Sequence, residues 1–431
     1  MCRLTRGACC AAVGVISFVT GCAAPRAEVP ASSGASRAAV VEAPPIAKPP
    51  PFERITAAEA GVDAAALEVL RRRGAETRSD AVIVLRDGKL VLDERYGHED
   101  GPIETMSVSK SLVALVVGRL VDTGRIRSID EPVHRFYPEW KQGKKEHVTV
   151  RHLLEQTSGL QANRTTEEIY ASPDFVHLAL SAELTTDPGT TFFYNNKAVN
   201  LLAGIAQIAG KKPLDLLARE ELFGPLGIDE VGWDHDKAGN PHAMSGIQLR
   251  PLDLAKVGQM MLDGGRYQGR QIVSADWIRR TTTPSAKNDR YGFLTWIEHD
   301  ASFVLDDSVF DAWKKAGLEP AFIAKILPLK DRVFAPNDDF FGAIAAAIGG
   351  EKKVALESWY DHTWRRGLPD ARAIDKHQIG FRMDGYLGQV VVVFPEKHLV
   401  AVRMRRFREG EGDQREYQFG DFVKKVRALV H

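Results

Sequence analysis

Apolar and polar positions along the chain follow several periods, and each period predicts a kind of element. Residues 63–74, DAAALEVLRRRG, have helical spacing and end at a glycine. The stretch AVIVLRDGKLVLDERYG reads as two strands around Asp87-Gly88, a strong hairpin signal. From 128 to about 235 the sequence is almost all helix and loop with Pro and Gly punctuation. Further helices are predicted at 251–265 and 274–280.

The C-terminal part returns to strand character. YGFLTWI (291–297) predicts a strand, and GQVVVVFPEKHLVAVRMRR (388–406) predicts a hairpin that turns at Pro395-Glu396. A terminal helix of about 18 residues is expected to start near Asp413. A sheet assembled from both ends of the chain, with a helical insertion between them, is the economical arrangement. The pattern therefore predicts an α+β fold.

The N-terminus is typical of a secretory signal. Arg3 and Arg6 precede an apolar run, residues 8–19, that is too short to be a permanent membrane span and ends in Val-Thr-Gly-Cys22. These last residues resemble a bacterial lipobox, whose cysteine is lipidated after cleavage, which gives a signal peptide at 1–21. The alternative is a plain secretory signal with an incidental cysteine. All four cysteines lie in the first 22 residues, so the mature body would form no internal disulfide, which favours the lipoprotein.

The segment after Cys22 has the composition of a tether. Residues 23–52 hold seven of the chain's 22 prolines without an apolar period, so they cannot bury a core. We expect a lipidated tether at 22–52 and a folded body at 53–431. The protein is then expected in the cell envelope, anchored by lipid on the periplasmic face of a bacterial membrane.

Composition and charge exclude several classes of protein. Hydrophobic residues make up 44% and charged residues 26%, the balance of a soluble globular protein. Lys plus Arg and Asp plus Glu both number 57, so nothing indicates a nucleic-acid partner. GIAQIAGKK (204–212) has the wrong glycine spacing for a phosphate loop, and no histidine pair has zinc-ligand spacing. No cofactor or metal is expected.

Ser107 and Lys110 stand at the mouth of an apolar helix, in TMSVSKSLVALVVG. At i and i+3 their side chains share a helix face. Helix N–H groups could stabilise an oxyanion at Ser107, and an apolar wall would disfavour the charged lysine and make it a better base. The alternative is structural, because serine is a preferred N-cap. On this motif alone, capping is the stronger interpretation.

A second candidate motif is Tyr194-Asn195-Asn196, just before a predicted helix. Asn196 could cap that helix and Tyr194 could belong to the core. Alone this motif is weak.

Together and in this order, the two motifs resemble the serine β-lactamase and penicillin-binding protein superfamily, in its class C β-lactamase and esterase branch. Several connecting segments look like those of the family in the same order, among them VTVRHLLEQTSGL (148–160), FGPLGI (223–228) and the stretch 245–278. The resemblance runs over most of residues 60–431. It implies the β-lactamase/transpeptidase-like fold: an antiparallel sheet flanked by helices, with an all-helical subdomain at about 128–235.

The resemblance also implies roles for the motif residues. Ser107 is expected to be the nucleophile, Lys110 its base, Tyr194 a proton relay to the leaving group and Asn196 a hydrogen-bonding partner of the substrate. Ser109 is then structural. Two basic groups around one hydroxyl suit acylation followed by deacylation, since one takes the proton while the other returns it.

The third motif departs from the family pattern. Where the family has Lys-Thr-Gly, or His-x-Gly in esterases, this chain has Met383-Asp384-Gly385, followed by Tyr386, and these residues are expected to edge the substrate site. An Asp here would repel the carboxylate of a β-lactam, which favours ester or amide substrates that lack this anion. Arg382, just before the triplet, is the competing possibility: it would supply the cation if the strand register turned it inward.

A second departure is an insertion at about 299–375, where the family usually has a shorter loop. It is either a cap over the cleft or a surface excursion far from it. We expect a lipid-anchored serine hydrolase that cleaves a small ester or amide through an acyl-enzyme. The alternative is a non-catalytic envelope protein that uses the same fold to bind peptidoglycan or a partner.

Overall fold

The computed structural model describes residues 52–97, 101–163, 165–335, 339–410 and 418–430. The predicted signal peptide, Cys22 and nearly all of the predicted tether lie outside these residues. Within the described part, no helix combines the length and the apolar composition that a membrane crossing requires.

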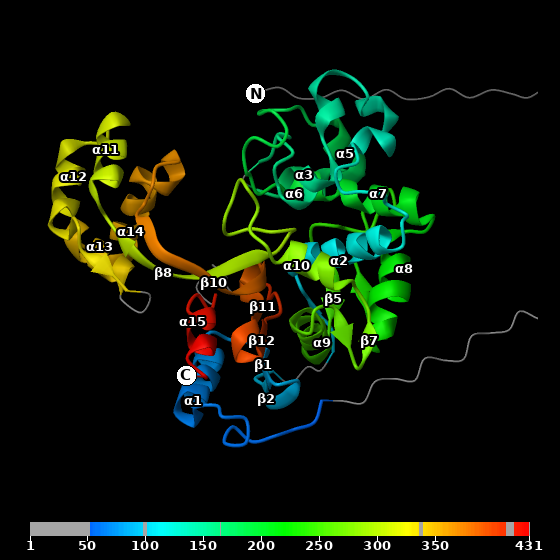
Figure 1. Ribbon diagram of the computed structural model, residues 1–431, viewed down its shortest axis with the longest axis horizontal. Coiled ribbons are helices and arrows are strands. Elements are labelled where there is room, and N and C mark those ends of the chain that lie inside the picture. Colours follow the sequence, from blue (N-terminus) through cyan, green and yellow to red (C-terminus); the bar gives the residue numbers. More distant parts are fainter. Residues whose placement is uncertain (1–51, 98–100, 164, 336–338, 411–417, 431) are drawn as a thin grey trace, which may run out of the picture. The chain divides into compact units, whose positions relative to one another are not determined.

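In the described residues the main sheet is antiparallel and seven-stranded, in the order β2-β1-β12-β11-β10-β8-β9 (Figure 1). Its strands are β1 (Ala81–Arg86), β2 (Lys89–Arg95), β8 (Trp296–Val304), β9 (Val333–Phe334), β10 (Arg372–Gly385), β11 (Gln389–Phe394) and β12 (Leu399–Met404). Small sheets are formed by β3 (Ile103–Glu104), β4 (Gly232–Trp233) and β5 (Ile247–Leu249), and by β6 (Arg266–Tyr267) and β7 (Arg270–Gln271).

The described residues also form helices on both faces of the sheet and away from it. They are α1 (Ala64–Glu76), α2 (Val108–Asp122), α3 (Val150–Leu154), α4 (Glu167–Ala171), α5 (Phe175–Ser181), α6 (Asn196–Val199), α7 (Leu201–Gly210), α8 (Leu214–Ala218), α9 (Pro251–Leu262), α10 (Ala275–Thr281), α11 (Asp307–Lys315), α12 (Pro320–Ile326), α13 (Phe340–Ile348), α14 (Lys352–His362) and α15 (Phe422–Arg427).

The central strands are buried on both faces because helices cover both. Val400 and Val402 of β12 face a core shared with α2 and α9, whereas Leu399 and Ala401 face a second core shared with α1 and α15. Alternation of side chains across a strand explains how one strand serves two cores. The unbroken apolar runs of the C-terminal hairpin have this cause, and its turn lies at Pro395–Lys397, as the sequence predicts.

Three predicted elements differ from the structure. Helix α1 runs through Gly74, where the close approach of Tyr96 leaves no room for a Cβ, so this glycine serves packing and does not end the helix. Strand β8 starts at Trp296, because residues 291–295 form a turn with Leu294 at a φ of 49°. The terminal helix α15 spans six described residues, since a turn at Gly420 precedes it.

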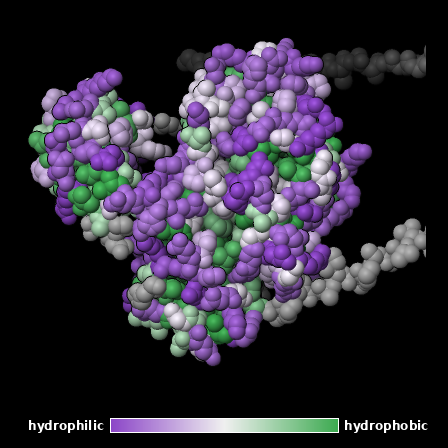
Figure 2. All heavy atoms as spheres, in the orientation of Figure 1, coloured by the Kyte–Doolittle hydropathy of each residue, from purple (hydrophilic) through white to green (hydrophobic). Residues whose placement is uncertain are grey.

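Strands β8 and β10 are longer than their neighbours and carry the module α11–α14. This module has its own apolar core, which includes Phe310, Trp313 and Trp359. Residues 299–304 and 372–375 of the expected insertion belong to the two strands themselves. Figure 2 shows hydrophobic groups on the visible face of the module, and its exposed apolar side chains include Val354 and Trp364.

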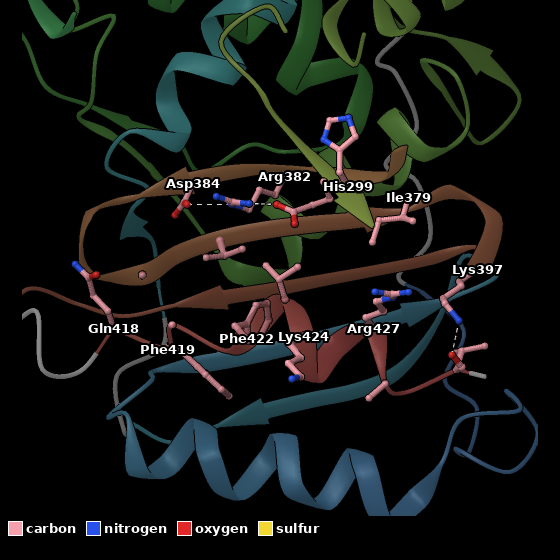
Figure 3. Close-up of a pocket in the computed structure, with 17 residues that line it drawn as sticks. His299, Ile379, Arg382, Asp384, Lys397, Gln418, Phe419, Phe422, Lys424 and Arg427 are labelled. Atoms are coloured by element: carbon pink, nitrogen blue, oxygen red, sulfur yellow. Dashed lines mark hydrogen bonds and ion pairs between the residues drawn. The ribbon is translucent and has the colours of Figure 1, made fainter. Parts of the chain in front are cut away.

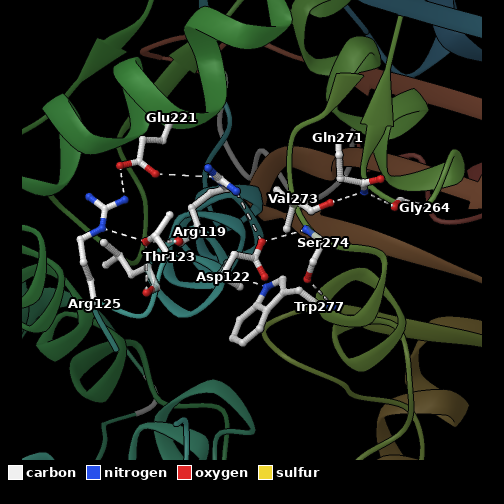
Figure 4. Close-up of polar contacts among 12 residues, drawn as sticks. Arg119, Asp122, Thr123, Arg125, Glu221, Gly264, Gln271, Val273, Ser274 and Trp277 are labelled. Carbon is white, nitrogen blue, oxygen red and sulfur yellow. Dashed lines mark hydrogen bonds and ion pairs between the residues drawn. The ribbon is translucent and has the colours of Figure 1, made fainter. Parts of the chain in front are cut away.

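Helix α2 is held at its C-terminal end by a polar network (Figure 4). Asp122 accepts a 2.8 Å hydrogen bond from the Ser274 N–H ahead of α10 and lies 3.6 Å from Arg119. Arg119 and Arg125 both pair with Glu221. Because these contacts come from two separate segments, they fix the direction of α2 and with it the position of its N-terminus.

Gly118 in the middle of α2 tests this packing. A Cβ on this residue would lie 2.4 Å from the buried Trp277 ring, whose Nε1 donates a 3.0 Å bond to Ala114 O. Glycine to alanine normally stabilises a helix by about 1 kcal/mol. Here we expect Gly118→Ala to lower the free energy of unfolding by about 1–3 kcal/mol, because the indole cannot move aside.

Urea denaturation measures this change. Gly420→Ala is the control, since no heavy atom lies within 4 Å of a Cβ there, and it should change the free energy of unfolding by less than about 0.5 kcal/mol. A stabilised Gly118→Ala protein would contradict the described packing of Trp277 on α2.

Candidate active site

Ser107 occupies the N-cap position of α2, but its side chain caps nothing. The interpretation that the Ser107 hydroxyl caps the helix is therefore wrong. Instead the Lys110 Nζ lies 2.7 Å from Ser107 Oγ and makes a second 2.7 Å bond to Met244 O. Met106, just before the serine, has a φ of 51°, a conformation that costs energy in a non-glycine residue and is typical of functional sites.

Ser109 has the structural place expected from the sequence. It is fully buried, and its Oγ lies 2.9 Å from Thr105 Oγ1 and accepts a 3.2 Å bond from the Ile247 N–H. These bonds tie the first turn of α2 to strand β5. The hydroxyl of Ser107 is thereby left as the one turned toward the lysine.

Lys110 is buried among the apolar residues of its own helix and the surrounding core. Burial lowers the pKa of its amine from 10.5 to about 7, because a charge in this place loses its hydration. A substantial fraction of the amine is therefore neutral near pH 7, and a neutral amine can accept a proton. The Met244 carbonyl and the Ser107 hydroxyl satisfy its remaining hydrogen-bonding needs.

Tyr194 approaches the same serine from the loop before α6. Burial raises the pKa of its phenol to about 12, the hydrogen bond with Ser107 opposes this rise, and the carboxylate of Asp384 adds to it. The ring lies stacked on Trp296, with centroids 6.1 Å apart, and Lys110 Nζ lies 5.1 Å from the ring centroid. Ser107, Lys110 and Tyr194 thus form one cluster.

The alternative interpretation of Asn196, that it caps the helix α6, is wrong. The neighbouring Asn195 does so, accepting a 2.9 Å bond from the Ala198 N–H. The side chain of Asn196 is thus not engaged as the cap, and the residue lines the cavity in front of Ser107.

This cavity measures about 480 Å³. It is lined by Met106, Ser107, Thr165, Thr166, Glu167, Tyr170, Asn196, Met244, Ser245 and Tyr386. None of these belongs to the module α11–α14. Asn196 and Tyr386 were expected at the site from the sequence, whereas the wall around α4 was not, because its short helix carries no pattern that distinguishes it from a surface turn.

Polar contacts hold the α4 wall against the site. The Tyr170 hydroxyl lies 3.0 Å from Ser245 Oγ. Lys197, next to Asn196 and almost fully buried, donates a 2.9 Å bond to Glu168. These contacts join α4 to the segments that carry Asn196 and Met244, so the cavity has a fixed wall on this side.

Gly385 places the end of β10 against the backbone of Ser107. A Cβ there would lie 2.7 Å from Thr105 O and 3.1 Å from the Ser107 N, so the close approach of the two backbones needs glycine. Met383 is fully buried in the core. The position where the family has its first third-motif residue therefore presents nothing to the cavity.

The sequence interpretation treated Arg382 and Asp384 as alternatives, of which one would face the substrate site. In the structure they form a pair. Residues two apart on a strand share a face, and the Arg382 Nε donates a 3.1 Å bond to Asp384 while the guanidinium also pairs with Glu298. Arg382, Asp384 and Glu298 all line a separate hollow of about 850 Å³ beside α15, and Figure 3 shows Arg382 next to Asp384 there. Asp384 does not line the Ser107 cavity, although its charge acts on Tyr194.

Comparison with known proteins gives the class of this chain. Residues 66–322, more than half of the chain, match the model of the Beta-lactamase family, and the chain belongs to that family. The family and the β-lactamase/transpeptidase-like fold predicted from the sequence are therefore confirmed. By family the chain is therefore β-lactamase-like, and one of its relatives carries the name of a hydrolase.

Individual relatives follow from the same comparisons. The chain is 32% identical to the 6-aminohexanoate-dimer hydrolase of Paenarthrobacter ureafaciens over 48% of this chain and 58% of that protein. It is 25% identical to Protein flp of Staphylococcus aureus over 39% and 38% of the two chains. The chain thus spans less than two thirds of either curated relative.

Solved structures show the fold. A putative 6-aminohexanoate-dimer hydrolase from Bacillus anthracis superposes with a TM-score of 0.58 at 15% identity, covering 88% of this chain and 85% of that one. EstCE1, a hydrolase with promiscuous acyltransferase activity, superposes with a TM-score of 0.54 at 14% identity, covering 85% and 98%.

The pKa of Lys110 gives a prediction about the reactivity of Ser107. If a neutral Lys110 activates the serine, modification of Ser107 by a fluorophosphonate should rise about tenfold per pH unit below pH 7 and level off above it. The rate of labelling, followed by mass spectrometry between pH 5 and 10, measures this. In Lys110→Met the serine should be labelled slowly, and the labelling rate should show no midpoint near pH 7. A labelling rate that still rises about tenfold per unit up to pH 10, as the ordinary lysine pKa of 10.5 would give, would contradict the desolvated amine.

Proposed function

We propose that this chain cleaves an ester or amide bond through an acyl-enzyme on Ser107. The observation that carries the proposal is the buried amine of Lys110, 2.7 Å from Ser107 Oγ and with its pKa lowered to about 7. A serine hydroxyl is a weak nucleophile until a nearby base takes its proton. Lys110 is suited to that task near neutral pH.

Acylation would begin with transfer of the Ser107 proton to the neutral Lys110 amine as Oγ attacks the substrate carbonyl. The resulting oxyanion would lie near the N-terminus of α2, where the Ser107 N–H and the positive end of the helix stabilise negative charge. Gly385 brings the backbone of β10 against the same point. The site therefore has a nucleophile, a base and a place for the developing charge.

Tyr194 is suited to the opposite proton transfer. With its pKa raised to about 12 the phenol keeps its proton at neutral pH and can donate it to the leaving alcohol or amine. The protonated Lys110 would then return its proton to the Tyr194 phenolate directly, since Ser107 Oγ is held in the acyl bond. Water then attacks the acyl-enzyme, and the same groups act in reverse, releasing the acid and restoring Ser107. Asn196, on the cavity wall, would hydrogen-bond the substrate.

The substrate class follows from the charges around the cavity. Glu167 is an acidic lining residue, and the carboxylate of Asp384 acts on the Tyr194 phenol. The trio Glu298, Arg382 and Asp384 sums to one negative charge. These features favour substrates without a carboxylate next to the reacting carbonyl. The name of the 32% identical relative supports an amide of an amino acid as one candidate class.

The decisive variant is Ser107→Ala. We expect turnover of a simple activated ester to fall by about 10⁴-fold or more, because the bond-forming atom is removed. The free energy of unfolding should change by about 1 kcal/mol at most, since the hydroxyl caps nothing. Steady-state kinetics and urea denaturation measure the two effects.

Ser111→Ala is the matched control for this variant. It removes a hydroxyl one turn along the same helix, which bonds to Leu294 O away from the cavity, so it should lose stability and keep turnover. Native turnover in Ser107→Ala would sink the proposed chemistry. Absence of labelling and of turnover in the native protein would instead favour the non-catalytic envelope protein.

Substrate charge gives an independent prediction. At an effective dielectric near 20, like charges about 8 Å apart repel by roughly 2 kcal/mol, which corresponds to about 30-fold in rate. We therefore expect a neutral ester to be cleaved with a higher kcat/KM than penicillins. Asp384→Asn should shift the ratio toward the penicillin by up to about 30-fold.

The ratio of the two kcat/KM values is the measurement, because it cancels effects on the shared chemistry. Glu183→Gln is the control, since this exposed acid does not line the cavity and should leave the ratio unchanged. A native enzyme that prefers the penicillin would contradict the proposal that the charge of Asp384 disfavours anionic substrates. An unchanged ratio in Asp384→Asn would contradict it as well.

A further inference from the structure

A stack of three side chains runs from the nucleophile into the sheet. The Tyr194 ring lies nearly parallel to Trp296, at 16° and 6.1 Å, and the Arg382 guanidinium carbon lies 5.7 Å from the Trp296 ring centroid. Trp296 and Arg382 are Cα partners in the β8–β10 ladder. The order of the sheet thus sets Arg382 against the indole that contacts Tyr194.

Arg382 is held in place by carboxylates. Its guanidinium pairs with Glu298 of β8 and bonds Asp384 of its own strand, and about a quarter of its side chain is exposed. A planar guanidinium can form such pairs and at the same time lie against an aromatic ring, which the point charge of an ammonium does less well. This position therefore makes use of arginine chemistry and not of positive charge alone.

The same arginine controls a charge that reaches Tyr194. Asp384 acts electrostatically on the Tyr194 phenol, and Arg382 is the partner that offsets this carboxylate. Without the guanidinium, Glu298 and Asp384 would be two negative charges on neighbouring strands that have lost the cation they share. They would repel each other and move, and Trp296 would lose one of its supports.

We propose that Arg382 is a positioning residue of the hydrolase: it fixes Trp296 against Tyr194 and keeps Asp384 paired, so that the phenol stays within hydrogen-bonding reach of Ser107. This inference rests on the proposed function. It assigns a role to the cation that precedes the altered third motif, although this cation does not line the substrate cavity. Arg382 acts through Trp296 and touches no reacting atom.

The hollow on the far side of Arg382 makes the inference testable by chemical rescue. It measures about 850 Å³, is open to solvent and is lined by Glu298, Arg382 and Asp384 as well as by residues of α15 (Figure 3). A small cation can enter it without passing through the Ser107 cavity. Removal of the Arg382 side chain should therefore leave a site that free guanidinium ions can fill.

The experiment compares native enzyme, Arg382→Ala and Arg382→Lys with a neutral activated ester. A misplaced catalytic group costs up to about 100-fold. We expect Arg382→Ala to lower kcat by about 10- to 100-fold with KM changed less than about threefold, because the substrate does not contact Arg382. Millimolar guanidinium should restore kcat at least fivefold in Arg382→Ala and leave the native enzyme unchanged. Arg382→Lys should lie between the two.

Arg372→Ala is the matched control. This variant removes an arginine of the same strand that pairs with Asp306 and not with Glu298 or Asp384. It should keep native kcat. Native kcat in Arg382→Ala would overturn the inference, and so would a loss that guanidinium does not restore in a protein with a native thermal melting curve. If Arg382→Ala does not fold, Arg382→Lys decides, since native kcat there would exclude a role for the stacked guanidinium.

The two proposals fail in different ways. Ser107→Ala that still hydrolyses the ester would remove the proposed function and this inference with it. An enzyme that depends on Ser107 but is indifferent to Arg382 would overturn the inference alone.

Discussion

Lys110 carries its amine into the core on helix α2, and the chemistry proposed for the site depends on that burial. A charge there has one carbonyl and one hydroxyl to replace its hydration, so the neutral form is favoured and the pKa falls to about 7. The surroundings must stay closed for this to hold. Trp277 against Gly118, the ion pairs at Glu221 and the bond from Ser274 to Asp122 hold the helix in that setting.

The burial has opposite effects on the two titrating groups beside Ser107. In water the lysine pKa of 10.5 and the tyrosine pKa of 10.0 almost coincide, so neither group is specialised. Burial destabilises the charged form in both cases, which is the cation for lysine and the anion for tyrosine. Their pKa values separate to about 7 and about 12, which leaves an acceptor and a donor at the same pH. One physical cause therefore suits the two groups to the two proposed roles.

How far the sequence predicted this arrangement depends on the range of each interaction. Ser107 and Lys110 are one helical turn apart, so local geometry predicted their contact, and the hairpins followed from strand period and turn residues. The meeting of Tyr194 with Ser107 came from family resemblance, because no local rule joins segments so far apart. The α4 wall with Tyr170 has no periodic signal. The choice between Arg382 and Asp384 ignored that positions two apart share a strand face, and an ion pair between them is a tertiary fact.

Strand β10 has a structural role at each end, and Arg382 lies between the two ends. Toward its start it supports the module α11–α14, and at its end Gly385 lies against the backbone of Ser107. The module has a core of its own, so its helices do not need the site for their stability. The pairing of Arg382 with Trp296 and Glu298 lies between these ends and locks β10 to β8 at the level of Tyr194. A strand that bears a separately packed module at one end and lies against Ser107 at the other needs such a lock, because displacement along its length would otherwise reach Gly385 and Ser107.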